Sequence, residues 1–201
     1  MNDTATRKIF GLILAAGTAS RFGSTKQLEV IDGLSLVRRA VLLCNDVFGE
    51  NTLLVVGYDW QRVLRSSGLS AGFLACNDSH AAGIGTSIAA GIRSLRHAAD
   101  AATIVMADQP MITASHLRAL ERAWSGADDE IVATAFAATT GPPVLFPRAC
   151  FTELVKLADD AGAKALLRDP RFTVRSVAFE AAAVDVDTPA DLSRAASSAR
   201  N

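Results

Sequence analysis

Two cationic side chains, Arg21 and Lys26, stand in a short polar stretch that follows an apolar run ending at Gly17. The run Ile9–Ala16, broken only by one glycine, is typical of a strand buried on both faces. Open α/β sheets bind ligands in loops at the carboxyl ends of such strands. Backbone N–H groups beside two cations suit a polyphosphate. We therefore expect a phosphate-binding loop here.

Two well-known phosphate motifs do not fit this loop. A Walker A motif needs four residues between its glycines and a lysine after the second, whereas five residues separate Gly17 from Gly23 and Ser24 follows. The dinucleotide fingerprint G-x-G-x-x-G is also absent here. The loop therefore predicts phosphate binding of another kind, or, as the alternative, an ordinary loop with solvated charges.

Carboxylates follow two other apolar segments. Asp108 comes directly after the expected strand Ile104–Ala107, and Asp187 ends the short apolar stretch Val184–Asp187. Mg²⁺ prefers hard oxygen ligands and is held by one or two carboxylates, with phosphates and water completing its shell. We expect Asp108 and Asp187 to be Mg²⁺ ligands, with Asp185 as the second choice beside Asp187. The alternative for both is helix capping.

The elements that position these residues alternate between strand and helix. This order predicts a three-layer, doubly wound α/β fold with a mostly parallel sheet, formed by a single domain over residues 1–201. The proline-rich stretch after Phe136 predicts a reversed, bent or edge strand. Helix N-caps are expected at Ser35, Asp59, Thr113 and Thr188. The expected strands are 9–16, 28–31, 52–56, 69–76, 102–107, 131–136, 144–146, 173–177 and 184–187; the expected helices are 35–46, 59–65, 86–97, 113–124, 149–158, 162–167 and 188–195.

The loop resembles a signature of the nucleotidyltransferases with a glycosyltransferase-A-like fold. Leu14–Gly17, Arg21–Gly23 and Lys26–Leu28 match it, while Ala19 stands where the family usually has serine. The strand end at Asp108 and the segment containing Asn77 are similar to the family's metal-binding and nucleobase segments. The resemblance implies catalytic roles for Arg21, Lys26 and Asp108. It implies nucleotide binding by Leu14, Ala15, Ala16, Gly17, Lys26, Asn77, Gly83 and Ser87.

Four later segments are similar to molybdenum cofactor cytidylyltransferases. They are Asn77–Ser87, Gly141–Phe146, Asp160–Lys164 and Val184–Leu192, with His80 where tryptophan is frequent and Lys164 where arginine is frequent. Ala16 stands where guanylyl-transferring relatives typically have glycine, which implies CTP. The resemblance implies that the acceptor binds Gly141, Pro143, Asp160 and Lys164.

The resemblance implies transfer of CMP from CTP to the phosphate of a molybdopterin-type cofactor, with Mg²⁺ and release of pyrophosphate. A molybdenum hydroxylase apoenzyme is a further expected partner. The alternatives are guanylyl transfer to the same cofactor, cytidylyl transfer to methylerythritol phosphate or a sugar phosphate, and a non-catalytic chaperone that carries the cofactor. No histidine is needed as a base, and His97 and His116 are expected at surface or half-buried positions.

The composition and charge of the chain limit which partners and which cellular location are expected. With 20 basic and 21 acidic residues the formal net charge is -1, so no global basic field exists to hold a nucleic acid polymer. The run Ile9–Ala16 is too short for a bilayer, which takes about 20 residues, and no signal peptide is evident, so a cytoplasmic protein without membrane contact is expected. Three cysteines without C-x-x-C spacing disfavour a disulfide framework or zinc site.

Overall fold

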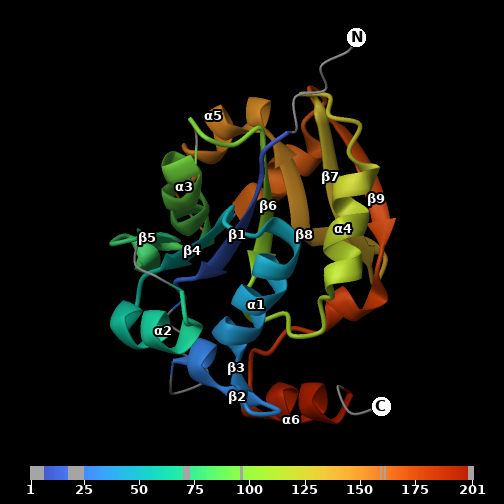
Figure 1. Cartoon of the computed structure of the whole chain (residues 1–201). Coiled ribbons are helices and arrows are strands. Elements are labelled where there is room, and N and C mark those ends of the chain that lie inside the picture. The colour runs from blue at the N-terminus through green and yellow to red at the C-terminus, as the bar shows by residue number, and fades with distance from the viewer. Residues whose placement is uncertain are drawn as a thin grey trace.

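The computed structural model describes residues 7–17, 25–69, 73–95, 97–158, 160 and 162–198 (Figure 1). Strands and helices alternate along them, as the sequence pattern predicts. The strands are β1 (Ile9–Ala15), β2 (Val30–Ile31), β3 (Leu34–Ser35), β4 (Thr52–Val56), β5 (Leu74–Cys76), β6 (Ala101–Met106), β7 (Glu130–Phe136), β8 (Thr139–Pro147) and β9 (Thr173–Ala178). The α-helices are α1 (Leu36–Phe48), α2 (Trp60–Ser67), α3 (Ile84–Leu95), α4 (Ala114–Ala123), α5 (Phe151–Leu154) and α6 (Pro189–Ser198). The 3-10 helices are η1 (Lys26–Leu28), η3 (His80–Ala82), η4 (Arg148–Cys150), η5 (Gly162–Arg168) and η6 (Glu180–Ala183).

Seven strands form one sheet in the order β5-β4-β1-β6-β8-β7-β9. All are parallel except β8, which runs antiparallel to both of its neighbours, β6 and β7. The expected reversed strand is therefore confirmed, and it is the proline-containing one. Reversal has a consequence for the site, because the beginning of β8 reaches the same edge of the sheet as the carboxyl ends of β1, β4 and β6.

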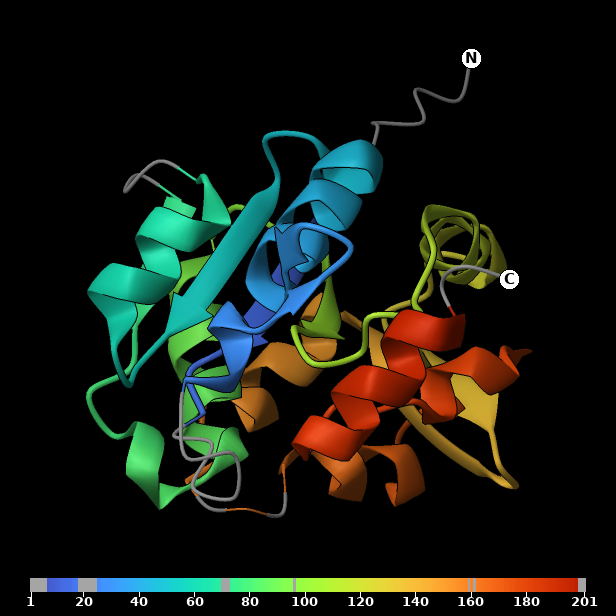
Figure 2. The ribbon, with the colours of Figure 1, turned by 90° about the horizontal axis from the view of Figure 1, so that it is seen from below.

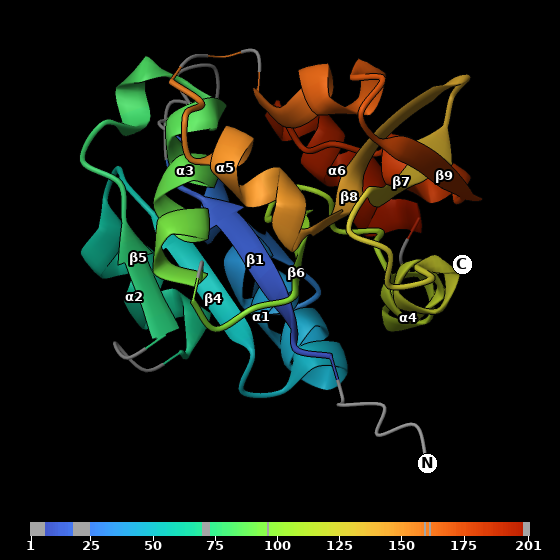
Figure 3. The ribbon, with the colours of Figure 1, turned by 90° about the horizontal axis from the view of Figure 1, so that it is seen from above.

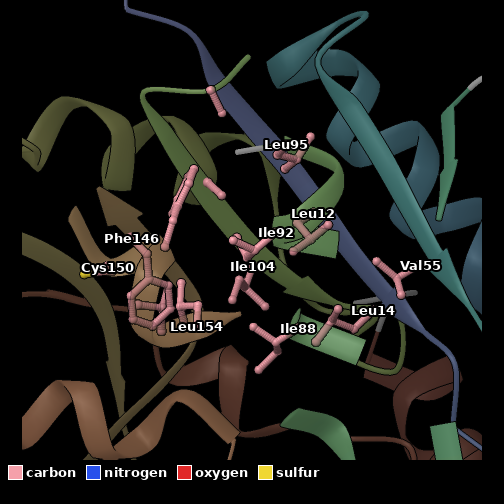
Figure 4. Close-up of a cluster of buried hydrophobic side chains, with 14 of the residues drawn as sticks. Leu12, Leu14, Val55, Ile88, Ile92, Leu95, Ile104, Phe146, Cys150 and Leu154 are labelled. Carbon is pink, nitrogen blue, oxygen red and sulfur yellow. The ribbon is translucent and has the colours of Figure 1, made fainter. Parts of the chain in front are cut away.

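Helices cover both faces of the sheet. Figure 3 shows α3 and α5 on one side and α1 and α4 on the other. Alternate residues of β1 face opposite ways, as expected for a strand: Leu12 and Leu14 pack with Ile88 and Ile92 of α3 (Figure 4), whereas Ile13 packs toward α1. Within α3, a side chain at Gly91 would lie 2.5 Å from Leu12, so glycine permits the close approach of helix and sheet.

A small third cluster lies below the sheet. The β2–β3 hairpin and α6 lie together at the lower end of Figure 1, and Figure 2 looks at this end. Ile31 and Leu36 pack there with Val186 and Ala195. Thr188 caps α6, and its hydroxyl and N–H both donate to Asp191. The hairpin and α6 thus fix the segment that carries Asp187.

Several local predictions were wrong. Residues 184–187 form no strand; the chain follows η6 and is held by a hydrogen bond of 2.9 Å from the Val186 N–H to the Asp108 carbonyl. The strand expected over 69–76 is only Leu74–Cys76, and 70–72 lie outside the described residues. Asp59 makes no capping bond to α2, because its carboxylate accepts from the Thr25 hydroxyl at 2.8 Å. Of the alternatives given for the proline-rich strand, only the edge position is wrong, because β8 lies between β6 and β7.

Within the part of the chain described, no helix has the length and apolar character needed to cross a membrane.

Candidate active site

Three charged side chains from distant parts of the chain meet at the carboxyl edge of the sheet. The Lys26 Nζ lies 2.7 Å from Asp108 Oδ2 and 2.9 Å from Asp187 Oδ1. Asp108 follows β6, as expected, and Lys26 begins η1. The sequence placed all three in one site, and the structure brings them into direct contact.

The surroundings of Lys26 are held by side chains of the same loop. Gln27 is buried, and its Nε2 donates to the Gly17 carbonyl at 3.0 Å, which ties the turn to the end of β1. Thr25 anchors the other side through Asp59 after β4. The position of Lys26 is thus fixed by two neighbouring strand ends. Arg21 and Ala19 lie outside the described residues, so the predicted role of Arg21 stays a prediction.

The charges in this cluster influence each other. Burial opposes the charge of Lys26, but the carboxylates of Asp108 and Asp187 outweigh it, and the net pKa of the ammonium is raised. Although Asp185 as a residue keeps an exposed surface, desolvation of its carboxyl and the nearby charge of Asp108 raise its pKa to about 6. Three carboxylates therefore share a region in which one cation compensates only part of their charge.

The carboxylates fit a divalent cation that is completed by a ligand. No group of three or more histidine, cysteine or acidic side chains in the described segments can hold a metal ion without other ligands. Asp108 and Asp187 nevertheless both reach one cationic group, the Lys26 ammonium. Two hard oxygen donors without a full protein cage suit Mg²⁺, which is usually bound through one or two carboxylates together with phosphate oxygens and water.

A polar cavity of about 410 Å³ opens beside this cluster. Gly17 and Lys26 line one side, and Gly83 and Ser87, at the beginning of α3, line another. Helix N-termini and loops of this kind present N–H groups to anions. Of the predicted site residues, those that line this cavity are Leu14, Ala16, Gly17, Lys26, Gly83, Ser87, Asp108 and Asp160.

Asn77 has a structural environment that the sequence did not indicate. Its Nδ2 donates to Thr86 at 2.8 Å and to Ser87 at 2.9 Å, and its Oδ1 accepts from the Ser79 N–H at 3.0 Å. The amide thus organises the first turn of α3, and Asn77 does not line the cavity. Ala15 does not line it either, since its side chain packs on the opposite face of the sheet.

His80 also lines the polar cavity. Its ring packs on Gly57, where a Cβ atom would lie only 2.5 Å from the His80 Cβ. Tyr58 approaches the ring edge-on, with ring centroids 6.3 Å apart. Gly57 directly follows β4, and the absence of a side chain there leaves room for His80 beside the strand end.

A second pocket, of about 290 Å³, adjoins the polar cavity and shares Leu14, Ile84 and Met106 with it. Its lining is predominantly apolar, and Phe136 and Phe146 contribute aromatic rings from β7 and β8. Predicted acceptor residues Gly141 and Lys164 line this pocket, whereas Pro143 does not, and Asp160 lines the polar cavity instead. The full lining is Leu14, Ile84, Ile88, Ile104, Met106, Phe136, Thr139, Thr140, Gly141, Pro142, Val144, Phe146, Gly162, Ala163, Lys164 and Leu167.

Sequence reasoning missed the apolar residues of this pocket, because an apolar residue near a strand end has the same pattern as any core residue. It also misjudged His116, which was expected at the surface or half-buried. His116 is only 4% exposed, and its Nε2 lies 2.8 Å from the Thr134 hydroxyl. The partner lies 18 residues away on β7, so no local signal in the sequence predicts the contact. His97 is exposed, as expected.

A family model described as the MobA-like NTP transferase domain matches residues 11–176 of the chain. The purine catabolism protein PucB of Bacillus subtilis (strain 168) is 32% identical over 118 residues, which are 57% of this chain and 56% of that protein. The match thus spans little more than half the length of this curated relative.

Solved structures with the same fold include two from mycobacteria. The Rv0371c homologue from Mycobacterium sp. strain JC1 is 25% identical, with a TM-score of 0.81 over 95% of this chain and 96% of that chain. Rv0371C from Mycobacterium tuberculosis H37Rv, solved in complex with manganese, is 24% identical, with a TM-score of 0.78 over 95% of this chain and 99% of that chain. Nearly the whole sheet and its helices therefore share their arrangement with these proteins.

Proposed function

The chain belongs to the MobA-like NTP transferase domain family, and we propose that it transfers CMP from CTP to the phosphate of a molybdopterin-type cofactor. An oxygen of the acceptor phosphate forms a new bond to the α-phosphorus of CTP. The bond from that phosphorus to the bridging oxygen of the β-phosphate breaks, and pyrophosphate leaves. No base is required, because a phosphate monoester is already anionic at neutral pH.

The observation that carries the proposal is the junction of the two pockets. The polar cavity holds Lys26 and Asp108, and the apolar pocket opens directly from it through Leu14, Ile84 and Met106. A ligand with a flat heterocyclic body and a terminal phosphate matches this pair, since the body would lie against Phe136 and the apolar lining while the phosphate reaches Lys26. A polyol such as methylerythritol phosphate or a sugar phosphate would leave most of its hydroxyls facing apolar side chains, which is costly.

Lys26 contributes positioning and charge stabilisation. Its ammonium is held in the polar cavity with a raised pKa, so it stays charged and can bind phosphate oxygens as negative charge spreads over them. Arg21, in the same loop, is proposed to contact the triphosphate as well. Gly17, Gly83 and Ser87 are proposed to donate backbone or hydroxyl hydrogen bonds to the nucleotide.

Asp108 and Asp187 are proposed to hold Mg²⁺, which when bound neutralises charge on the triphosphate oxygens. Their common contact with one ammonium supports this pairing over Asp108 with Asp185. The manganese complex of Rv0371C supports a divalent cation in this fold.

The choice of CTP rests on Ala16. Ala16 borders the polar cavity, and its carbonyl accepts a hydrogen bond from the Tyr58 N–H. A methyl group at this wall reduces the space for a purine relative to glycine. Guanylyl transfer to the same cofactor is the alternative that a larger cavity would favour.

A non-catalytic carrier of the cofactor, which delivers it to a molybdenum hydroxylase apoenzyme, is the alternative from another class. A carrier needs the apolar pocket but has no use for a lysine placed between two carboxylates. Delivery to such an apoenzyme is compatible with transferase activity, and we propose the apoenzyme as a protein partner.

The test measures pyrophosphate release with each of the four nucleoside triphosphates and Mg²⁺, with and without molybdopterin cofactor. Release that requires both CTP and the cofactor is expected. Asp108→Asn serves as the inactive control. Release with GTP, or with methylerythritol phosphate as acceptor, would redirect the assignment, and cofactor binding without any release would favour the carrier.

A further inference from the structure

Strand β8 loses its regular pairing where it enters the apolar pocket. Ala133 of β7 pairs with Val144, but the next residue, Thr134, pairs with Gly141, so Pro142 and Pro143 have no partner on β7. Pairing with β6 ends at Val144 as well. Proline has no N–H to donate to a neighbouring strand. The part of the pocket wall formed by Pro142, between Gly141 and Val144, is therefore not held by ladder hydrogen bonds.

A buried pair of side chains holds this segment instead. The Thr134 hydroxyl, fully buried, donates to the Pro143 carbonyl at 2.7 Å. A hydroxyl has a single hydrogen, and that bond uses it. The contact of 2.8 Å between the Thr134 oxygen and His116 Nε2 must therefore have the ring N–H as its donor. His116 thus carries its proton on Nε2 and supports Thr134 from the far face of the sheet.

The orientation of the His116 ring is fixed from a second direction. It stacks on Phe179, with ring centroids 4.3 Å apart and an angle of 15° between the planes. Desolvation lowers the pKa of His116, which keeps the ring neutral near pH 7. A ring held by stacking and by burial directs its N–H at one place, the Thr134 oxygen.

The contacts from His116 through Thr134 to Pro143 lead to residues that line the apolar pocket. Gly141, Pro142 and Val144 form one wall, and a Cβ atom at Gly141 would lie 3.2 Å from the ring of Phe136, so the wall is in close contact with an aromatic side chain of the same pocket. None of the residues from Thr134 to Phe146 lines the polar cavity. A change at His116 should therefore reach the apolar pocket and leave the polar cavity unaffected.

We propose that His116 is a positioning residue for the acceptor: through Thr134 it sets the place of the Gly141–Val144 wall without touching the ligand. The inference rests on the proposed assignment of the apolar pocket to the acceptor. It adds a determinant of acceptor affinity on the opposite face of the sheet.

The test compares His116→Leu, which removes the donor, with His116→Gln, whose side-chain amide can donate from a similar position. Leu120→Val, a truncation of a fully buried residue one turn along α4, is the matched control for general loss of packing. For each protein we would measure cofactor affinity by calorimetry, CTP affinity without cofactor, the KM and kcat of pyrophosphate release, and thermal unfolding.

His116→Leu is expected to weaken cofactor binding and raise the acceptor KM about tenfold, with CTP affinity unchanged, whereas His116→Gln and Leu120→Val remain within twofold of the wild type. Thr134→Val should reproduce the His116→Leu effect, and the double variant should add little to it. Equal effects of His116→Leu and Leu120→Val on the cofactor, or an equal loss of CTP affinity, would overturn the inference.

The outcomes separate this inference from the proposed function. Wild-type protein that binds the cofactor and releases no pyrophosphate contradicts the transferase activity, while the affinity ratio between wild type and His116→Leu still decides the role of His116. Wild-type protein that transfers CMP normally, with no change in acceptor affinity in His116→Leu, overturns the positioning role alone. Absence of cofactor binding to the wild type overturns both.

Discussion

Lys26 donates a hydrogen bond of 2.7 Å to Asp108, although 82 residues separate them in the sequence. The contact joins the loop after β1 to the end of β6, two neighbouring parallel strands of the sheet. Because adjacent parallel strands end at the same edge, residues that follow them meet without any local connection between them. The pair defines the centre of the proposed transferase site.

Replacing Lys26 with methionine should lower kcat by at least about a hundredfold, since a fixed cation that stabilises developing charge contributes on this scale. The pair lies at the cavity surface, with Lys26 side chain exposure of 13%, so thermal unfolding should change little. Pyrophosphate release and a melting curve check both points. Arg118→Met removes the exposed pair with Asp46 and is the control, expected to keep wild-type turnover. Near-normal turnover of Lys26→Met would refute the proposed role.

Removing divalent cations with a chelator should abolish transfer, and Mg²⁺ should restore it. Asp187→Asn should raise the Mg²⁺ concentration needed for half-maximal rate at least about tenfold, because one of the two proposed oxygen ligands loses its charge. Asp185→Asn, two residues away, should change this concentration less than twofold. A Mg²⁺ titration of the rate checks each variant. The reverse order of the two effects would make Asp185 the second ligand.

The alternation of strands and helices and the reversed strand followed from the sequence, because apolar runs, glycines and prolines act locally. Asp187 lies near Asp108, but not for the reason that the sequence suggested. Residues 184–187 form no strand, and the hydrogen bond from the Val186 N–H to the Asp108 carbonyl holds this segment instead. Such contacts depend on packing between the β2–β3 hairpin and α6, which no short pattern encodes. The family resemblance likewise implied that Asn77 binds the nucleotide, yet its amide donates hydrogen bonds to Thr86 and Ser87.

Ala16→Gly should reduce the preference for CTP over GTP about tenfold in kcat/KM, because it removes a methyl group from the wall of the polar cavity. Ala15→Gly is the matched control, since Ala15 faces the opposite core and does not line the cavity. Initial rates with both nucleotides at saturating cofactor give the ratio for each protein. An unchanged ratio in Ala16→Gly would remove the basis for assigning CTP from this residue.

Gly91→Ala should destabilise the protein by about 1–3 kcal/mol through overpacking. The added Cβ would lie 2.5 Å from a Leu12 methyl and 2.9 Å from a Val55 methyl, all within the buried cluster between α3 and the sheet. The cost of overpacking exceeds the gain in helix propensity, about 1 kcal/mol, that alanine brings over glycine in a helix interior. Ser94→Ala, on the exposed side of α3, is the control and should change stability by less than about 0.5 kcal/mol. Denaturant unfolding of the two variants measures the difference, and a stabilised Gly91→Ala would show that helix and sheet separate easily.

The free energy of unfolding should decrease between pH 7.5 and pH 5.5 in a way that depends on His116. Burial lowers the pKa of His116 in the folded protein, whereas the unfolded chain has the ordinary value of about 6.5. The unfolded chain therefore binds more protons in this range, and the stability that the neutral ring contributes is fully present above pH 6.5 and is lost as the pH falls toward the folded-state pKa. The glutamine in His116→Gln cannot titrate, so denaturant unfolding at the two pH values should give a smaller decrease for the variant than for the wild type.

Asp185, with a raised pKa of about 6, contributes with the opposite sign, but equally in both proteins, so its contribution cancels in the comparison. Identical pH dependence in wild type and variant would mean that His116 is protonated as easily in the fold as outside it, which its hydrogen bond to Thr134 and its stacking on Phe179 do not permit.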